Sequence, residues 1–345
     1  MRRLFGNRYA RRLAAAVVTL ALLDPLVPGV VARAERVRYE SVQSFRFENS
    51  DLFALGPIVE YFREHPKGEG PRVVFLGDSV VWGYWIRATE TVPAQLQRLV
   101  PDERVFNFGI NGFGAASDLL ITKAIIDSVD TVYLFDMEQE VNPLLPSLIP
   151  ITDPDLKRFH LDRPNQLESR LRRWAGIWNL YRYSYRLQAA WFGMSTRLYV
   201  YLNKSQLARA PLRAIRREPP PGVPAAVAEG PVPPGVVVTA PRAAAPLTEE
   251  RAVQLATAYP WQWNFGTLIQ VHGKEAVVVE LDGHCVVESE RDLADLNSAF
   301  NPAVQFVRLS VPKELRPDTT HFSPEGARAV AHALLSFRQA SRVKR

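Results

Sequence analysis

A repeated succession of apolar strand, loop and helical segment constrains the fold of this chain most. Short runs rich in β-branched and aromatic residues occupy 73–76, 105–108 and 131–135, and two similar runs occupy 276–281 and 304–309. Runs that are apolar on both faces are typical of parallel strands covered by helices on both sides. The sequence therefore predicts an α/β protein with a doubly wound, five-stranded parallel sheet in a three-layer α/β/α arrangement.

Helical patterns separate these runs. Apolar spacing and start signals such as proline in a first turn mark their positions. The predicted helices cover 52–64, a segment beginning near Thr91 with Pro93 in its first turn, 115–128, 248–272 with a kink at Tyr259-Pro260, 290–300, and a terminal helix from Pro324.

The first strand ends abruptly at Gly77-Asp78-Ser79. A buried strand that stops at a glycine can present a serine at the carboxyl edge of a parallel sheet, where such folds bind their ligands. Far along the chain, Asp318 and His321 lie three residues apart in a predicted loop before the terminal helix. A serine becomes a nucleophile when a neutral imidazole accepts its proton and a carboxylate orients that imidazole. Taken singly, Gly-Asp-Ser also fits an ordinary turn, and the Asp-x-x-His spacing fits a solvated loop.

Together, in this order, the two motifs resemble the first and last sequence blocks of the SGNH, or GDSL, hydrolase family. The resemblance covers about 72–142 and 276–337. It implies a flavodoxin-like fold without a cofactor, in which Ser79 is the nucleophile, His321 the general base and acid, and Asp318 the residue that orients the imidazole.

The family resemblance also implies an oxyanion hole, meaning N–H donors that meet the negative charge developing on a carbonyl oxygen. Its donors would be the Ser79 backbone N–H, a glycine N–H after the second strand and an asparagine side chain after the third. Gly112 matches the glycine, with Gly109 and Gly114 as alternatives. The third block departs from the family, because no Gly-x-Asn-Asp follows the strand 131–135. Asn142 is the nearest asparagine and Gln139 offers another amide; Asn142 also fits a plain turn residue before Pro143. Trp82 and Trp85 fit either a substrate pocket or the core.

The N-terminal segment has the pattern of an export signal. Five arginines and no acid lie within residues 1–12, and Leu13 to Leu23 is uninterrupted and apolar. The alternatives are a signal cleaved after the small-x-small triplet 32–34, or a retained membrane anchor, against which Asp24 and two nearby prolines count. In either case the arginines should stay cytoplasmic, and the rest of the protein should lie on the periplasmic or extracellular side.

The domain organisation follows from these segments and from composition. We expect a signal or anchor at 1–34, a linker and helix at 35–70, and one hydrolase domain at 71–340. Two insertions interrupt this domain: a helical one rich in arginine and aromatic residues at 151–210, and a flexible proline-rich one at 211–247. The first fits a lid, a sugar-stacking surface, a membrane-interface helix or, as we favour, an amphipathic helix packed on the sheet.

Composition narrows the class of partner. The net charge of +6 is modest and is concentrated near the N-terminus and around 170–217, which does not indicate a nucleic-acid partner. With one cysteine, Cys285, and no paired histidine spacing, neither an internal disulfide nor a metal site is expected. The predicted activity is that of an exported serine esterase acting on a small ester or an O-acylated carbohydrate. The alternatives are an O-acyltransferase for an envelope polysaccharide and a non-catalytic polysaccharide-binding or assembly subunit.

Overall fold

The computed structural model describes residues 8–30, 59, 62, 70–84, 86–110, 114–136, 178–182, 231–241 and 247–343. Most of the helix expected at 52–64 and most of the two insertions lie outside these ranges. Four residues singled out from the sequence also lie outside them: Trp85, Gly112, Gln139 and Asn142.

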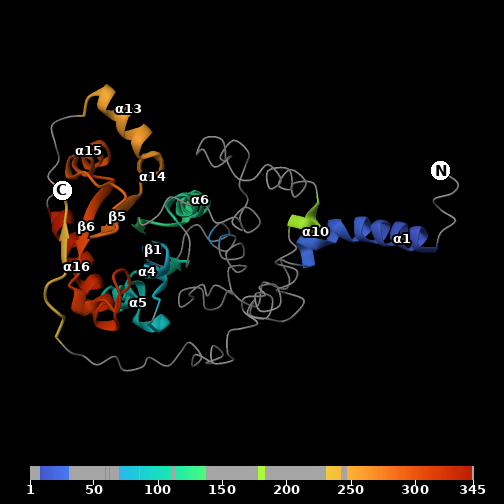
Figure 1. Ribbon diagram of the computed structural model, residues 1–345, viewed down its shortest axis with the longest axis horizontal. Coiled ribbons are helices and arrows are strands. Elements are labelled where there is room, and N and C mark those ends of the chain that lie inside the picture. The colour runs from blue at the N-terminus through green and yellow to red at the C-terminus, as the bar shows by residue number, and fades with distance from the viewer. Residues whose placement is uncertain are drawn as a thin grey trace.

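A six-stranded mixed sheet forms the centre of the protein (Figure 1). The strand order is β2-β1-β3-β5-β6-β4. Five strands are parallel: β1 (Arg72–Gly77), β2 (Arg104–Gly109), β3 (Thr131–Phe135), β5 (Glu275–Leu281) and β6 (Val304–Ser310). They coincide with the five predicted runs within one residue or so at each end, so the α/β class and these strands are confirmed.

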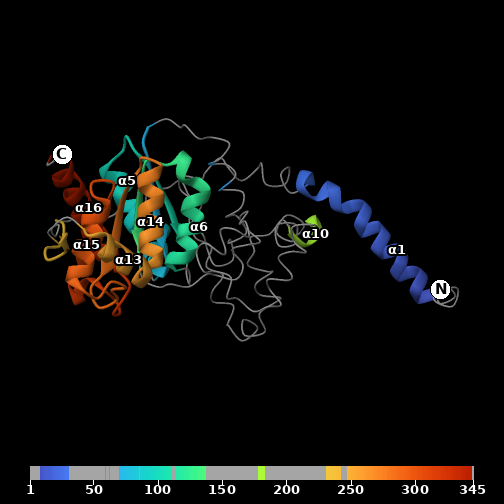
Figure 2. The ribbon, with the colours of Figure 1, turned by 90° about the horizontal axis from the view of Figure 1, so that it is seen from above.

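Both faces of the sheet are buried, because the parallel strands are apolar on both sides. Val74 and Leu76 of β1 face one hydrophobic cluster, and Val73 and Phe75 face the other. The first cluster is covered by α6 (Ala115–Ile125), α13 (Glu249–Ala258), α14 (Pro260–Val271) and α15 (Glu290–Phe300), and the second by α4 (Ser79–Trp82), α5 (Val92–Leu99) and α16 (Pro324–Val343). Helices α6 and α14 pack side by side, as Figure 2 shows.

The helix boundaries follow local capping chemistry. The Thr91 side chain accepts a hydrogen bond from the Ala94 N–H and begins α5, with Pro93 in the first turn as predicted. The expected kink at Tyr259-Pro260 is a complete break between α13 and α14, because the Pro260 ring has no N–H to continue the helical ladder. Short 3₁₀ turns occur at Asp24–Leu26 (η1), Ala88–Glu90 (η4), Ile126–Ser128 (η5) and Lys313–Leu315 (η8).

The sixth strand corrects two predictions. β4 (Val237–Thr239) lies within the segment expected to be flexible, and it pairs antiparallel with β6, so the sheet is neither five-stranded nor wholly parallel. Val238 lies opposite Leu309 in this pairing. Three residues among prolines carry too little periodicity to be recognised as a strand. Here the open edge of β6 supplies the hydrogen-bonding partners that order them.

The N-terminal helix presents apolar side chains to the surroundings. The helix α1 (Arg8–Leu23) continues through η1, and the span Arg11–Val30 has 20 residues with a mean hydropathy of 2.0. This segment is long and apolar enough for a signal anchor or a membrane span. The short helix α10 (Asn179–Arg182) lies beside its carboxyl end (Figures 1 and 2). There the Asp24 carboxylate accepts backbone hydrogen bonds from Asn179 at 3.1 Å and Leu180 at 2.6 Å.

Candidate active site

Ser79 lies at the carboxyl edge of the sheet, as the first residue of α4. The turn before it depends on Gly77, whose φ is +144° and where a Cβ would stand 2.9 Å from Val81 Cγ2. Asp78 caps α4, because its carboxylate accepts a 2.9 Å hydrogen bond from the Val80 N–H. Strand, glycine turn and capped helix thus fix the direction in which the serine points.

The loop before α16 brings Asp318 and His321 to this serine. Asp318 Oδ1 accepts the backbone N–H groups of Thr320 at 2.8 Å and His321 at 2.7 Å, which closes the loop into a turn. The other oxygen, Oδ2, lies 2.8 Å from His321 Nδ1, and His321 Nε2 lies 2.8 Å from Ser79 Oγ. The three residues named from the sequence therefore meet as one hydrogen-bonded triad, although Ser79 and His321 are 242 positions apart.

This arrangement has the parts needed for nucleophilic catalysis. With the Nδ1 proton donated to Asp318, Nε2 is free to accept the Ser79 hydroxyl proton. The imidazolium that would form faces a carboxylate that stabilises its charge. The side chains of His321 and Asp318 are 18% and 39% exposed, so a substrate or water can reach the triad from solvent.

Of the expected oxyanion donors, the structure describes Ser79. Its N–H belongs to the first turn of α4, whose N–H groups have no acceptor within the helix. Gly112, Asn142 and the alternative Gln139 lie outside the described residues. Gly109, by contrast, already donates its N–H to Asn107 Oδ1 at 2.9 Å, so its N–H is committed to that side chain.

The absence of a side chain at Gly109 has a packing reason. A Cβ there would lie 2.3 Å from the Trp82 backbone nitrogen, so glycine lets β2 approach α4 closely. Asn107 completes this contact by donating its side-chain amide to the Val81 carbonyl at 3.1 Å. Gly109 and Asn107 therefore support the helix that carries Ser79. The other alternative, Gly114, is the N-cap of α6.

Two residues near the triad were not recognised from the sequence. His284, in the loop after β5, lies with Nε2 3.1 Å from Thr320 Oγ1 and so contacts the triad loop. The ring of Tyr84 lies beside His321, with the ring centroids 5.0 Å apart. The position of His284 could have been predicted, because it follows a parallel strand at the carboxyl edge of the sheet, where such folds bind ligands. Tyr84 had only its nearness to Ser79 in the chain.

Three buried carboxyl groups lie in the core next to this edge of the sheet: Asp118 of α6, Asp136 after β3 and Glu280 of β5. Burial, with the nearby charges of Asp78 and Asp136, raises the pKa of Asp118 well above its usual range. Burial raises the pKa of Asp136 to about 6, against the opposing hydrogen bond from Gln262. Burial and then Asp136 raise the pKa of Glu280 to about 8.

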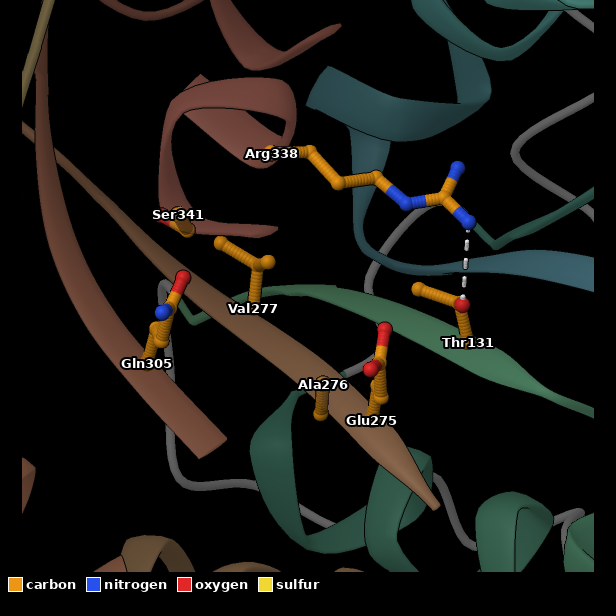
Figure 3. A pocket seen from close by; sticks show the side chains of 7 residues that line it. All are labelled: Thr131, Glu275, Ala276, Val277, Gln305, Arg338 and Ser341. Atoms are coloured by element: carbon orange, nitrogen blue, oxygen red, sulfur yellow. Dashed lines mark hydrogen bonds between the residues drawn. The ribbon is translucent and has the colours of Figure 1, made fainter. Parts of the chain in front are cut away.

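The hollow shown in Figure 3 lies away from the triad. It is lined by Thr131 and Glu275, which begin β3 and β5, and by Arg338 of α16, so it belongs to the amino-terminal edge of the sheet. Arg338 also forms an ion pair of 2.6 Å with Glu103. This region is a structural contact between α16 and the sheet. Among the described residues, no three His, Cys, Asp or Glu side chains gather to hold a metal ion.

Comparisons of the chain with protein-family models, with curated proteins and with solved structures found no match.

Proposed function

We propose that the protein is an extracytoplasmic serine esterase of the SGNH type, with a doubly wound sheet modified by the antiparallel β4. The observation that carries this proposal is the pair of 2.8 Å contacts that link Ser79 Oγ, His321 and Asp318. A non-catalytic binding subunit has no need of this alignment, whereas a nucleophile does. The exposed apolar N-terminal helix supports export, with the arginine flank on the cytoplasmic side.

The reaction proceeds through an acyl-serine. Ser79 Oγ attacks the ester carbonyl carbon while His321 Nε2 takes the hydroxyl proton, and the carbonyl oxygen becomes negatively charged. The Ser79 N–H is the described donor for that oxygen. His321 then protonates the departing alcohol oxygen, and the acyl group stays on Ser79. In the second half, His321 removes a proton from water, the hydroxide releases the carboxylic acid, and Ser79 recovers its proton.

A direct test uses hydrolysis of p-nitrophenyl acetate and labelling by a fluorophosphonate probe. Wild type should hydrolyse the ester and label, and Ser79→Ala and His321→Ala should do neither above background. Ser341→Ala and His332→Ala are matched controls on α16, away from the triad, and should behave as wild type. A wild type that neither labels nor exceeds Ser79→Ala in rate would overturn the esterase proposal. Acetyl transfer to an added sugar, in excess over hydrolysis, would instead assign the acyl-serine to an acyltransferase.

Fractionation tests the export proposal. The protein should be found on the periplasmic or extracellular side of the membrane, and N-terminal sequencing should separate an intact anchor from cleavage near residue 34. An intact protein free in the cytoplasm would contradict export.

A further inference from the structure

Tyr84 presents an exposed aromatic ring beside the proposed catalytic imidazole. The planes of the Tyr84 and His321 rings are inclined by 34° at a centroid separation of 5.0 Å. Tyr84 is 37% exposed, so more than a third of the residue's surface remains accessible to solvent. Covering apolar ring surface is favourable in water. A solvated ring next to a reacting group is therefore placed to contribute binding energy.

The backbone ties Tyr84 to the turn of the nucleophile. Gly83 ends α4 in the left-handed region with φ of 83°, and the N–H groups of Gly83 and Tyr84 both donate to the Ser79 carbonyl at 3.0 Å. A Cβ on Gly83 would stand 2.5 Å from Thr91 Cγ2, so the turn is closed against the residue that caps α5. The position of Tyr84 is thus fixed relative to Ser79.

The chemistry of this surface favours one class of ligand. The half-buried Trp82 ring lies with its centroid 6.1 Å from that of the Tyr84 ring, at 44°, and enlarges the aromatic surface. An acyl chain is best held in an enclosed apolar pocket that covers it on all sides. A sugar ring has an apolar C–H face and a rim of hydroxyl groups. That combination matches an aromatic ring that is partly open to water and carries a hydroxyl at its edge.

We propose that Tyr84, extended by Trp82, is a stacking subsite for the sugar ring that bears the ester, so that the substrate is an O-acylated carbohydrate. The inference rests on the proposed esterase function for its catalytic part. A sugar stacked on Tyr84 would hold its ester near His321, which gives its proton to the departing sugar oxygen and so forms the free sugar hydroxyl. Tyr84 is then a specificity residue and takes no part in proton transfer.

The test compares acetate release from a peracetylated methyl hexoside with release from vinyl acetate, which has no ring to stack. Tyr84→Ala should lower kcat/KM for the sugar ester by about tenfold, mainly by raising KM; this change corresponds to about 1.4 kcal/mol, which lies within the range for an aromatic contact. The ratio of kcat/KM for the sugar ester to kcat/KM for vinyl acetate should therefore fall about tenfold, because only the sugar ester loses a stacking contact. Tyr84→Phe keeps the ring and should keep most of the sugar-ester activity. Trp178→Ala is a matched control, because Trp178 is similarly exposed at 41% but precedes α10 beside α1.

Binding of a non-hydrolysed complex separates this inference from the proposed activity. Ser79→Ala should bind the peracetylated hexoside in calorimetry, and the double variant Ser79→Ala/Tyr84→Ala should bind it about tenfold more weakly. If wild type hydrolyses nothing but this difference in binding is found, the esterase proposal fails and the stacking subsite stands. Equal loss of both activities in Tyr84→Ala, or equal binding by the single and double variants, would overturn the subsite.

Discussion

Glu280 makes the stability of the fold depend on pH, and the replacement Glu280→Gln should remove the contribution of this group to that dependence. The carboxyl group is fully buried, accepts one hydrogen bond from the Val287 N–H at 2.9 Å, and lies near the charge of Asp136. Glutamine keeps the acceptor oxygen and cannot ionise. The variant therefore isolates the cost of the negative charge.

The magnitude follows from the two pKa values. Glu280 loses its proton near pH 4.5 in the unfolded chain and near pH 8 in the folded protein, so between these values the folded state holds more protons and stability falls as pH rises. At about 1.4 kcal/mol per pKa unit, the ionised group costs the folded state about 2 kcal/mol at pH 6 and about 4 kcal/mol at pH 8, relative to acid conditions. Glu280→Gln should therefore gain about 2 kcal/mol over wild type between pH 6 and pH 8.

The assay is urea unfolding of the full chain in detergent at pH 5, 6, 7 and 8, followed by tryptophan fluorescence. Glu288→Gln removes an exposed carboxylate one residue after Val287 and should leave the pH dependence of unfolding unchanged. Asp136→Asn provides an independent comparison. The pKa of Asp136 is raised from 3.8 to about 6, so its effect should develop at lower pH, between these two values. Free energies of unfolding that run parallel with pH in wild type and Glu280→Gln would refute this reasoning.

Three further predictions concern the triad and the N-terminal helix. Asp318→Asn should lower kcat for p-nitrophenyl acetate by at least about 100-fold, because the imidazole loses the carboxylate that orients it. The control Asp282→Asn, in the loop after β5, should keep the wild-type rate. Equal rates for Asp318→Asn and wild type would show that Asp318 does not belong to the triad. Gly109→Ala would place a Cβ 2.3 Å from the Trp82 nitrogen and push α4 away, so we expect about 100-fold lower activity; Gly29→Ala, with no atom within 4 Å of its Cβ, should retain wild-type activity. Asp24→Ala removes the acceptor for the N–H groups of Asn179 and Leu180, and hydrogen exchange at these two amides should accelerate by about 10- to 100-fold. If the N-terminal segment is not cleaved off and hydrogen exchange at these two amides is nevertheless unchanged in Asp24→Ala, the contact between Asp24 and α10 is contradicted.

The sequence predicts the five parallel strands because each run is apolar on both faces, and because its short length and β-branched composition favour a strand over a buried helix. It also predicts Ser79, Asp318 and His321 as site residues, since the proposed nucleophile follows a strand and the other two share a loop. The pairwise distances come only from folding, which closes a gap of 242 residues.

Other features had no readable local signal. β4 depends on the edge of β6, which lies some 70 residues further along the chain. Asp136 and Glu280 look like ordinary charged residues after or within strands, and their burial is a property of the packed helices α6 and α14. In the sequence, Gly109 was an alternative candidate for an oxyanion donor. Its contact with the backbone of α4 becomes visible only in three dimensions.

The short strand β4 also has a consequence for the solubility of the protein. Without it, β6 would present a row of unpaired N–H and C=O groups on an apolar strand, which is the surface from which sheets of different molecules grow into one another. β4 covers this edge with only three residues, and Pro233 and Pro234 just before it, with Pro241 just after it, lack the N–H needed to extend the ladder. The segment 231–241 thus shields the edge of β6 from pairing with other molecules, and a deletion that removed β4 would leave an aggregation-prone edge.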